Sequence, residues 1–386
     1  MWEKQILLLP GPTPVPERVL RAMGRPAVNH RGPDFKAVLQ EVTRGLKDVF
    51  QTGNDVLVLT SSGTGAMEAA VVNFLSPGDK ALVLSVGQFG DRFKKICKTY
   101  GIEVIAPEFA WGTAVAPHKV EEVLTADTSH EIKAVLVQHN ETSTGVLNDI
   151  ASISRARGDH PALMIVDAIS GLAAAPLKTD AWGLDVVVAG SQKAFMLPPG
   201  LAMISVGPRA WERAVNNKSP KYYFDLQAAR DNLTQSQTPY TPAVSLFMGL
   251  LESLKMIQEE GQNECLSRHV FYRDVVRAGV KALGLELLAP DTIASPAVTA
   301  VRVPPGFKAG DISRPLRDKY QVIVAGGQGK LKEEIFRIGH LGYVQLTDLL
   351  AALSALELVM QDLNLPVRPG AGVAAAQQVI LAGRSG

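Results

Sequence analysis

Short apolar runs alternate with amphipathic segments along the first two-thirds of the chain. Each run has the length of a buried strand and is bounded by Gly, Pro, Ser or a charged residue. Between the early runs, apolar residues recur at helical spacing, for example at 35–50 and 66–75. This alternation predicts an α/β fold with a mostly parallel, seven-stranded sheet that is covered by helices on both faces. The strands are expected at 56–60, 81–86, 103–106, 134–138, 163–167, 186–190 and 201–206.

The last two of these strands depart from the alternation. Only residues 191–200 separate them, and this segment contains Pro198-Pro199-Gly200, so it is too short and too rich in proline for a crossover helix. We therefore expect these two strands to run antiparallel. Beyond Leu285, short strands mixed with helices predict a second, smaller α+β domain. Its strands are expected at 297–303, 322–325 and 336–339, and its helices at 310–319 and 345–359.

The predicted organisation has four parts. They are an N-terminal arm at 1–20, a large domain at 21–256, a small C-terminal domain at 257–362 and a tail at 363–386. The tail is rich in Gly, Pro, Ala and Gln, and we expect it to be weakly specified.

Composition narrows the possible partners. The 386 residues include 39 Lys or Arg and 38 Asp or Glu, so the net charge of +1 gives no reason to expect nucleic acid or an anionic membrane as a partner. The longest charge-free run, 232–251, contains two prolines and several polar residues, so it does not predict a membrane span. The N-terminus lacks the pattern of a secretory signal, and we expect a cytoplasmic protein. Two distant cysteines, Cys97 and Cys265, exclude a thiolate-held metal cluster or a disulfide scaffold, and no metal site is predicted.

The first candidate for chemistry is Lys193, which follows the apolar strand that ends at Gly190. A lysine among apolar residues at the end of a buried strand is costly to keep charged, so its pKa should fall. An amine that is neutral near pH 7 can attack an aldehyde and form a Schiff base. The alternative is an ordinary lysine that extends its ammonium group into water, and this segment alone favours that alternative.

Asp167 changes this balance. It ends the strongly apolar strand 162–166, where a carboxylate needs a cationic partner. A protonated pyridine nitrogen would supply that partner, and the pairing would keep the ring an electron sink. The alternative is an aspartate that caps the turn at a strand end. Because Asp167 and Lys193 both lie at carboxyl ends of predicted strands, where open α/β sheets bind ligands, the pair favours a site.

A third feature is the segment 61–65, Ser-Ser-Gly-Thr-Gly, between a strand and a helix. Small residues let the backbone approach an anion, the first N–H groups of the helix bind phosphate, and the hydroxyls of Ser62 and Thr64 add donors. Taken alone the segment is weak evidence, because Ser and Gly at such a turn often only cap the helix. It lacks the dinucleotide fingerprint and the lysine of a nucleotide-binding loop, which disfavours NAD and ATP.

Three more side chains are candidates for binding a ligand or a substrate. Phe89 follows another strand end and offers a face for a flat heterocycle, although packing is the default role of such a ring. Thr142, in a loop after a further strand, can hydrogen-bond a ring hydroxyl. Arg337, in a short strand of the small domain, offers a planar fork to a carboxylate, the alternative being an edge-strand arginine in water.

Together these residues resemble the class V, fold-type I aminotransferases that use pyridoxal 5'-phosphate (PLP). The likeness is strongest to the alanine–glyoxylate (serine–pyruvate) aminotransferases, and it covers almost the whole chain up to the tail. The motifs follow the order of that family: Leu8-Leu9-Pro10-Gly11-Pro12-Thr13, Ser62-Gly63-Thr64, Glu141-Thr142-Ser143-Thr144-Gly145, Val166-Asp167-Ala168, Gly190-Ser191-Gln192-Lys193 and Arg337-Ile338-Gly339.

The resemblance implies a role for each residue at the cofactor. Lys193 looks like the Schiff-base lysine, and Asp167 looks like the partner of the pyridine nitrogen. The other cofactor contacts that it implies are Ser62, Gly63, Thr64 and Gln192 at the phosphate, Thr142 at the ring hydroxyl, and Phe89 and Ile169 against the ring. Phe89 stands where animal relatives have Trp.

The resemblance also implies a homodimer with a shared active site. Thr241 resembles a phosphate contact that the neighbouring subunit donates. A second such contact, often Tyr, aligns with Thr238, while Tyr240 sits two residues further on, and the choice between them stays open. On the substrate side, Arg337 resembles the carboxylate clamp, and Gly11 belongs to the N-terminal motif beside it.

The implied activity is a ping-pong transfer of an amino group from alanine or serine to glyoxylate or another small 2-oxo acid. A 2-aminoethylphosphonate transaminase stays open as an alternative. A cysteine desulfurase or related lyase needs a nucleophilic cysteine on a loop, whereas Cys97 and Cys265 lie in helical patterns. A non-catalytic subunit of an oxidoreductase complex is a further alternative, but it would leave the pair Asp167 and Lys193 without a purpose.

Overall fold

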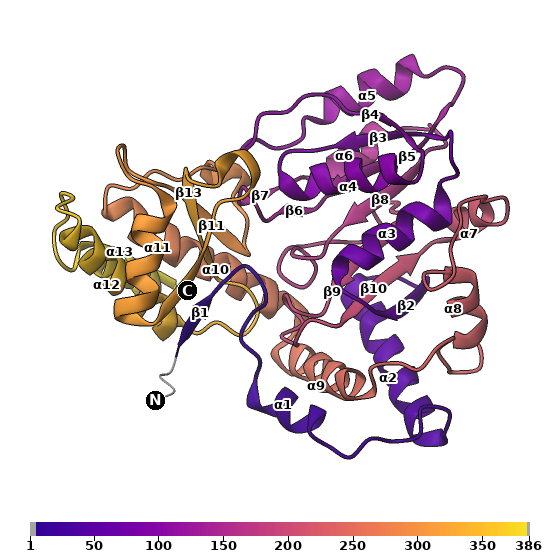
Figure 1. The fold of residues 1–386 in the computed structure, drawn as a ribbon, viewed down its shortest axis with the longest axis horizontal. Helices are drawn as coiled ribbons and strands as arrows, with labels where there is room; N and C mark the ends of the chain where they lie inside the picture. Colours follow the sequence, from indigo (N-terminus) through magenta and orange to yellow (C-terminus); the bar gives the residue numbers. More distant parts are fainter. Residues whose placement is uncertain (1–4, 384–386) are drawn as a thin grey trace.

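The computed structural model describes residues 5–383, and a seven-stranded sheet forms the centre of its larger part (Figure 1). The strand order is β2-β10-β9-β8-β5-β3-β4. Neighbouring strands are parallel except at β10, which runs antiparallel to both β9 and β2. The predicted α/β fold and the antiparallel final pair are therefore confirmed. The strands are β2 (Asp55–Thr60), β3 (Lys80–Leu84), β4 (Glu103–Ile105), β5 (Ile132–Gln138), β8 (Leu163–Asp167), β9 (Val186–Gly190) and β10 (Leu201–Val206).

A hydrophobic core lies on each face of this sheet, because successive residues of a strand point to opposite sides. In β5, Val135 and Val137 belong to one core, and Ala134 and Leu136 belong to the other. Helices cover both faces, as the sequence predicted. The first core contains residues of α2 (Pro33–Phe50), α5 (Pro117–Ala126), α6 (Ile150–Ala156) and α9 (Val244–Glu260); the second contains residues of α3 (Gly63–Phe74), α4 (Gln88–Thr99), α7 (Pro208–Ala214) and α8 (Leu226–Leu233).

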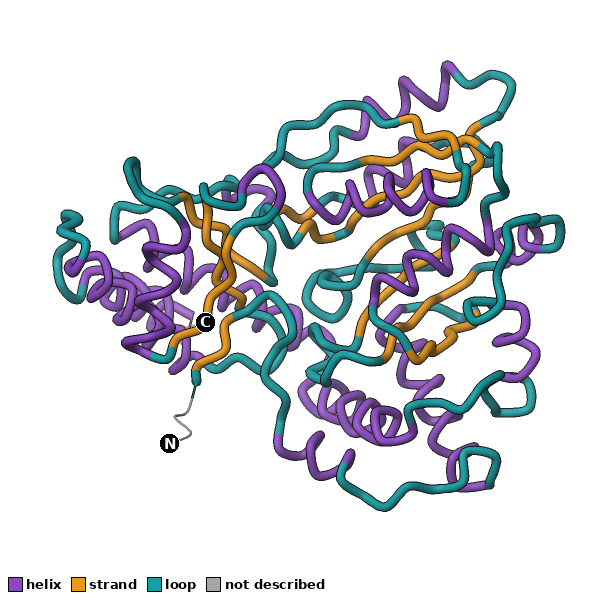
Figure 2. The backbone as a smooth tube through the Cα atoms, in the orientation of Figure 1, coloured by secondary structure: helices purple, strands orange, loops and turns teal. Residues whose placement is uncertain are grey.

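A second, four-stranded sheet forms the centre of the smaller part, apart from the large sheet (Figure 2). Its order is β1-β12-β13-β11, and the predicted α+β character is confirmed. The strand β1 (Ile6–Leu8) comes from the N-terminal segment and pairs in parallel with β12, which the sequence did not predict. The other elements of this part are β11 (Val298–Arg302), β12 (Val322–Gly326), β13 (Ile335–Gly339), α10 (Gln262–Ala282), η1 (Asp291–Ile293), α11 (Ala309–Tyr320), η2 (Gly329–Leu331), α12 (Leu346–Asp362) and α13 (Ala371–Gly383). The remaining helix, α1 (Glu17–Met23), packs against α9 in the larger part.

A short hairpin connects the two parts near the end of β5. It consists of β6 (Asn140–Glu141) and β7 (Val146–Leu147), which pair antiparallel. Its turn reaches the small sheet, because the oxygen of Gly145 accepts a 2.9 Å hydrogen bond from Ser295 N, just before β11. The hairpin therefore places the segment 140–145 between the two sheets (Figure 1).

The prediction of a weakly specified tail is wrong for residues 371–383, which form helix α13. The start of this helix is bound by the Glu357 carboxylate, which accepts hydrogen bonds of 2.7–3.1 Å from the backbone of Gly370, Gly372 and Val373. Ala376 and Ile380 are buried in the core of the small domain. An Ala-rich composition that looks like low complexity is also a good helix former, and here it has a surface to bury against. The ends of the predicted arm and tail, 1–4 and 384–386, lie outside the described residues.

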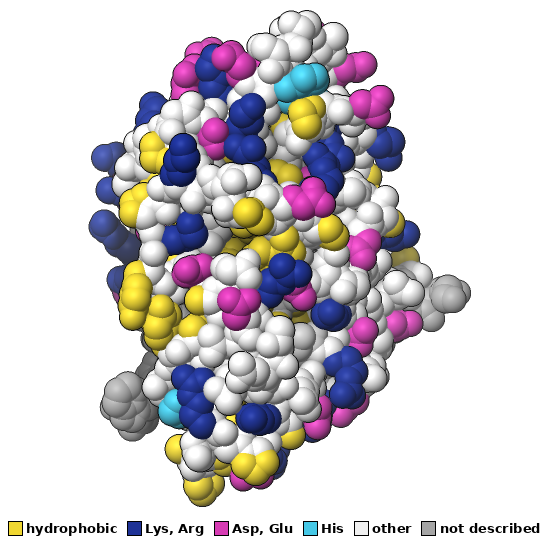
Figure 3. Space-filling model, turned by 90° about the vertical axis from the view of Figure 1, so that its right-hand side faces the viewer, with side chains coloured by type: hydrophobic (Ala, Val, Ile, Leu, Met, Phe, Trp, Pro, Cys, Tyr) yellow, Lys and Arg dark blue, Asp and Glu magenta, His cyan; other side chains and the backbone are white. Residues whose placement is uncertain are grey.

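The surface adds one observation about charge. On the face shown in Figure 3, acidic and basic side chains are interspersed, and neither sign forms a continuous field. Among the helices of residues 5–383, none combines the length and the apolar character that a membrane span requires.

Candidate active site

A cavity lies at the carboxyl ends of β2, β5, β8 and β9 and at the start of α4, as expected for ligand sites of open α/β sheets. Nine of the eleven residues predicted to contact a cofactor line it, whereas Tyr240 and Thr241 do not. The lining consists of Ser62, Gly63, Thr64, Phe89, Arg92, Asn140, Thr142, Asp167, Ile169, Ser170, Gln192 and Lys193.

Lys193 brings its amine to this cavity from the turn between β9 and β10. The residue is only 9% exposed, and its Nζ donates a 2.6 Å hydrogen bond to the oxygen of Pro10. Burial lowers the pKa of Lys193 to about 8, and the positive charge of Arg337 acts in the same direction. The predicted fall in pKa is thus seen, and a neutral amine, which attack on an aldehyde requires, is well populated near pH 8.

Gly11 lies directly against this amine. A Cβ atom on Gly11 would stand 2.4 Å from Lys193 Nζ, which is closer than such atoms approach one another. The residue also has a φ of +135°, a conformation that favours glycine. Glycine at this position therefore lets the N-terminal segment pass over the lysine.

Asp167 ends β8 and is buried, at 6% exposure. One carboxylate oxygen accepts a 2.9 Å hydrogen bond from Ile169 N, which is an uncharged donor. Burial raises the pKa of Asp167 to about 7, the negative charge of Glu141 raises it further, and the charges of Arg92 and Lys193 oppose these effects. A cation placed against this carboxylate would relieve the cost of its burial.

The start of α3 forms one end of the cavity. Ser62 is its N-cap, and no side chain of residues 5–383 caps the helix, so the first N–H groups remain available to an anion. A Cβ atom on Gly63 would lie 2.6 Å from Ile169 Cδ1, so only glycine fits between the helix and this wall. Gln192 reaches the same region, and its Oε1 is buried without a hydrogen-bond partner among the described residues.

The apolar walls come from Phe89, the second residue of α4, and from Ile169, just after β8. Arg92, one turn further along α4, lies with its guanidinium 4.7 Å from the centroid of the Phe89 ring. Its Nη1 also donates a 2.9 Å hydrogen bond to Thr64 Oγ1. Arg92 thus joins the aromatic wall to the start of α3.

A polar group lines the cavity near the hairpin. Thr142 Oγ1 and Ser170 Oγ lie 2.6 Å apart, and Asn140 Nδ2 donates a 2.9 Å hydrogen bond to the same Ser170 hydroxyl. The Oδ1 atom of Asn140 is buried and has no hydrogen-bond partner within the described part of the chain. An oxygen in this state can accept a hydrogen bond from a ligand hydroxyl.

Arg337 lies in β13 and is buried, at 4% exposure. Its guanidinium donates to two backbone oxygens, to Gly326 at 2.9 Å from Nε and to Thr142 at 3.0 Å from Nη1. Burial lowers the pKa of Arg337 to about 10, although Glu141 acts in the opposite direction. The alternative of an edge-strand arginine in water is therefore wrong, because β13 lies between β12 and β11. Within residues 5–383 this buried guanidinium bonds only neutral oxygens, so its charge can attract an anionic substrate.

The residues expected to act across a subunit interface lie outside the cavity. Tyr240 donates a 3.0 Å hydrogen bond to the oxygen of Tyr222, and its ring stacks on that of Tyr223, with centroids 5.3 Å apart. Thr241 is exposed, whereas Thr238 is mostly buried and its hydroxyl donates to the oxygen of Tyr240. Tyr222 is 79% exposed, so this aromatic group leaves a large apolar area open to a partner.

Three lining residues were missed from the sequence: Arg92, Asn140 and Ser170. Asn140 directly precedes the motif at 141–145, and Ser170 lies two residues after the motif at 166–168, so their positions after strand ends were available as a signal. Arg92 had no such signal, because only the helical spacing from Phe89 places its guanidinium at the cavity.

The residues present fit PLP. A carboxylate whose burial raises its pKa suits a protonated ring nitrogen, and the Asn140 oxygen, which is buried without a partner among the described residues, belongs to a cavity that also holds an amine. The open start of α3 suits the phosphate group.

The cysteines do not suit nucleophilic chemistry. Cys97 lies in α4 and Cys265 in α10, as the helical patterns predicted, and both are buried. Burial raises the pKa of each thiol to about 12, which keeps it protonated near neutral pH.

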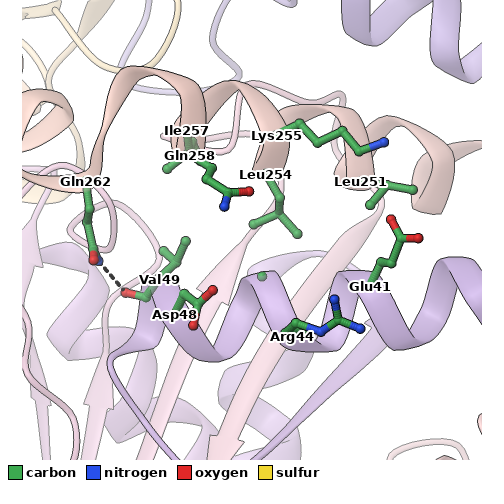
Figure 4. A pocket seen from close by; sticks show the side chains of 11 residues that line it. Glu41, Arg44, Asp48, Val49, Leu251, Leu254, Lys255, Ile257, Gln258 and Gln262 are labelled. Atoms are coloured by element: carbon green, nitrogen blue, oxygen red, sulfur yellow. Dashed lines mark hydrogen bonds between the residues drawn. The ribbon is translucent and has the colours of Figure 1, made fainter.

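A second cavity lies between α2 and α9 and contains none of these groups (Figure 4). Its floor is apolar, with Val49 and Leu254, and its rim carries charged side chains such as Arg44 and Lys255. Gln262 closes one end with a 3.1 Å hydrogen bond to the oxygen of Val49. The arrangement is that of two packed helices with a groove between them.

Comparisons with known proteins agree with this geometry. The family model for Aminotransferase class-V matches residues 6–332. The chain is 46% identical to "Soluble hydrogenase, small subunit" of Synechococcus sp. (strain PCC 6716), covering 98% of this chain and 99% of the relative. It is 40% identical to L-aspartate–glyoxylate aminotransferase of Paracoccus denitrificans, covering 98% and 96%, and 37% identical to serine–glyoxylate aminotransferase of Methylorubrum extorquens, covering 97% and 95%. The crystal structure of ureidoglycine–glyoxylate aminotransferase from Bacillus subtilis is similar with a TM-score of 0.92 at 29% identity, covering 98% and 99% of the two chains.

Proposed function

The chain belongs to the class V aminotransferase family, and we propose that it is a PLP-dependent transaminase that moves an amino group from alanine or serine to glyoxylate or another small 2-oxo acid. One observation carries the proposal: a lysine with a lowered pKa and an aspartate with a raised pKa share one cavity. Groups whose environments shift their pKa values in this way are typical of catalytic sites.

PLP, when bound, supplies an electron sink for the negative charge that develops as a proton leaves the substrate Cα. The chain's own residues hold and orient the reacting groups. Asp167 would stabilise the protonated ring nitrogen, while the start of α3 and the Gln192 amide would bind the phosphate. Phe89 and Ile169 would exclude water from the ring.

Lys193 has two roles in this proposal. Its amine would hold the cofactor, and it would also carry a proton to and from the substrate Cα as general base and acid. The low pKa that burial gives Lys193 suits both roles, because attachment of the cofactor and removal of the Cα proton both need the neutral amine at moderate pH. Arg337 would hold the substrate carboxylate and thereby orient the Cα–H bond.

We propose that the active form is a homodimer in the cytoplasm, with neither nucleic acid nor membrane as a partner. The exposed group of Tyr222, Tyr223 and Tyr240 supports an interface next to Thr241, which would then reach the phosphate in the neighbouring subunit. The names of the relatives with aminotransferase activity support glyoxylate as the acceptor.

Two other functions compete with this proposal. The name of the Synechococcus relative suggests a subunit of an oxidoreductase complex, and the likeness to other family members leaves a 2-aminoethylphosphonate transaminase open. The relative's name favours the first of these, but a non-catalytic subunit has no use for the shifted pKa values of Asp167 and Lys193.

The test is borohydride reduction of the protein loaded with PLP, followed by peptide mass spectrometry. We expect the cofactor on Lys193, and Lys193→Ala should carry none and turn over no substrate. A wild-type protein that takes up no PLP would overturn the proposal in favour of the non-catalytic subunit. A screen of amino donors against glyoxylate and pyruvate then identifies the substrate pair, and activity with 2-aminoethylphosphonate alone would replace alanine and serine.

A further inference from the structure

The carboxylate of Glu141 is the most enclosed acid beside the cavity, with no exposed surface. Its Oε2 accepts hydrogen bonds from Phe89 N at 3.1 Å and Gly90 N at 3.0 Å. Its Oε1 accepts from Ser143 N at 3.1 Å and from Ser143 Oγ at 2.6 Å. All these donors are uncharged, so the carboxylate is held by dipoles at the start of a helix.

Glu141 and Ser143 together bind the whole first turn of α4. Ser143 Oγ accepts a 2.9 Å hydrogen bond from Gln88 N, so three successive N–H groups, those of Gln88, Phe89 and Gly90, end on this pair. The approach is close, because a Cβ atom on Gly87 would lie 2.5 Å from the Glu141 side chain. The start of α4 is therefore fixed by the hairpin after β5.

Other helices of this chain are capped differently. Asp149 caps α6, and Asp225 caps α8, each from the position directly before its helix. The cap of α4 instead comes from a residue 52 positions away from Phe89. A local cap would hold the helix at lower cost, because burying a carboxylate is expensive. The distant cap does something a local one cannot, since it sets where α4 stands relative to the hairpin.

Both ends of this connection line the cavity. Phe89 provides the aromatic wall, and Thr142, between Glu141 and Ser143, provides the hydroxyl that meets Ser170. A ring that stacks on Phe89 and hydrogen-bonds near Thr142 depends on the distance between these two residues. The hydrogen bonds to Glu141 fix that distance.

We infer that Glu141 is a positioning residue for the cofactor. Glu141 fixes the distance between the Phe89 ring and the loop that contains Thr142. This inference rests on the proposed function, because it assumes that PLP is the ligand of the cavity. Glu141 itself touches neither cofactor nor substrate in this role.

The test measures the dissociation constant of PLP from the cofactor-free full chain. Glu141→Gln places an amide group against N–H donors, and we expect it to raise the Kd about fivefold to tenfold, the worth of a well-placed aromatic contact. Asp149→Asn is the matched control, because it makes the same chemical change at the exposed cap of α6 and should leave the Kd within about twofold.

A double variant separates positioning from a general loss of structure. Phe89→Leu keeps the apolar volume and removes the aromatic face, so it should also raise the Kd. If Glu141 acts through Phe89, the combined variant loses no more affinity than Phe89→Leu alone. Fold-changes that multiply in the combined variant, or an unchanged Kd in Glu141→Gln, overturn the inference.

If Glu141→Gln does not fold, Ser143→Ala decides. It removes the acceptor of Gln88 N and one donor to Glu141, so we expect a smaller rise in Kd that again does not multiply with Phe89→Leu. If the fold-changes in Kd caused by Ser143→Ala and Phe89→Leu multiply in the combined variant, the inference is overturned. A failure of the proposed function looks different, because the wild-type chain would then take up no PLP at all.

Discussion

The oxygen of Pro10 accepts a 2.6 Å hydrogen bond from the amine of Lys193, so the N-terminal segment lies directly over the proposed catalytic lysine. The same segment continues from β1, which is a strand of the small sheet. The amine in the large domain is therefore in contact with a segment anchored in the small one. This contact makes the size of the residue at position 11 critical.

We predict that Gly11→Ala reduces attachment of PLP to Lys193. The added Cβ would stand 2.4 Å from Nζ, and it cannot be accommodated without moving the lysine. The fraction of protein that carries the cofactor after borohydride reduction can be measured by mass spectrometry. We expect this fraction to fall at least about tenfold, because a displacement of the lysine that costs ~1.4 kcal/mol has this effect.

The matched control is Gly78→Ala. Gly78 also has a positive φ, +87°, but nothing lies within 4 Å of an added Cβ. Both variants therefore carry the backbone strain, and only one carries the clash. Equal incorporation of cofactor in the two variants would contradict the prediction.

Much of this site could be predicted from the sequence, because it depends on where strands end. Asp167 and Lys193 follow apolar runs, and in a parallel sheet such positions meet at one edge. Six of the seven strands of the large sheet were recognisable for the same reason, since each is an apolar run with buried residues on both faces, whereas the edge strand β4 has no buried residue.

What could not be predicted depends on contacts between distant segments. β1 has only three residues, which are too few to show the alternating pattern of a strand, and it forms by pairing with the distant strand β12. Helix α13 looked like a low-complexity tail because its burial depends on Glu357 and the core of the small domain. Arg92 became a lining residue only through the position of α4, which the sequence leaves open.

The pKa of Lys193 predicts a pH dependence for cofactor uptake. Burial lowers this pKa to about 8 from its ordinary value of 10.5, so the neutral amine is half populated near pH 8, against roughly 0.3% for an ordinary lysine. The rate constant for PLP uptake by the cofactor-free protein should therefore rise up to about pH 8 and then level off. Stopped-flow absorbance measures it, with an N-acetylated lysine amide as the reference amine.

Arg337 supplies an internal check on this profile. Its positive charge also lowers the pKa of Lys193, so Arg337→Met should move the midpoint of the uptake profile to higher pH. A midpoint near 10.5 in the wild-type protein would mean that the lysine is not buried as described.

Arg337 should also determine the use of carboxylate substrates. Removing a buried guanidinium that binds a carboxylate costs about 2–5 kcal/mol, so we expect Arg337→Ala to lower kcat/KM for alanine and serine roughly 30-fold to several thousandfold. Steady-state kinetics at saturating PLP measure this loss. Arg317→Ala, which removes an exposed arginine paired with Asp318, serves as the control. An unchanged kcat/KM in Arg337→Ala would show that another residue binds the carboxylate.

Asp167→Asn should stabilise the cofactor-free protein at alkaline pH while it removes activity. Because the folded pKa of Asp167 is raised to about 7 from 3.8, the folded state binds a proton more tightly than the unfolded state, and wild-type stability falls as the pH rises through this window. A shift of about three units corresponds to a cost on the order of 4 kcal/mol once the group is ionised in both states. Asparagine does not ionise, so the melting temperature of Asp167→Asn should exceed that of the wild type at pH 8, and the difference should shrink toward pH 4.

Addition of PLP should raise the melting temperature of the wild type more than that of the variant, because only the carboxylate gains an ion pair with the ring nitrogen. A difference that is the same at pH 4 and pH 8 would show that the carboxylate carries no cost of burial, and the fit of Asp167 to a cationic ring would then lose its physical basis.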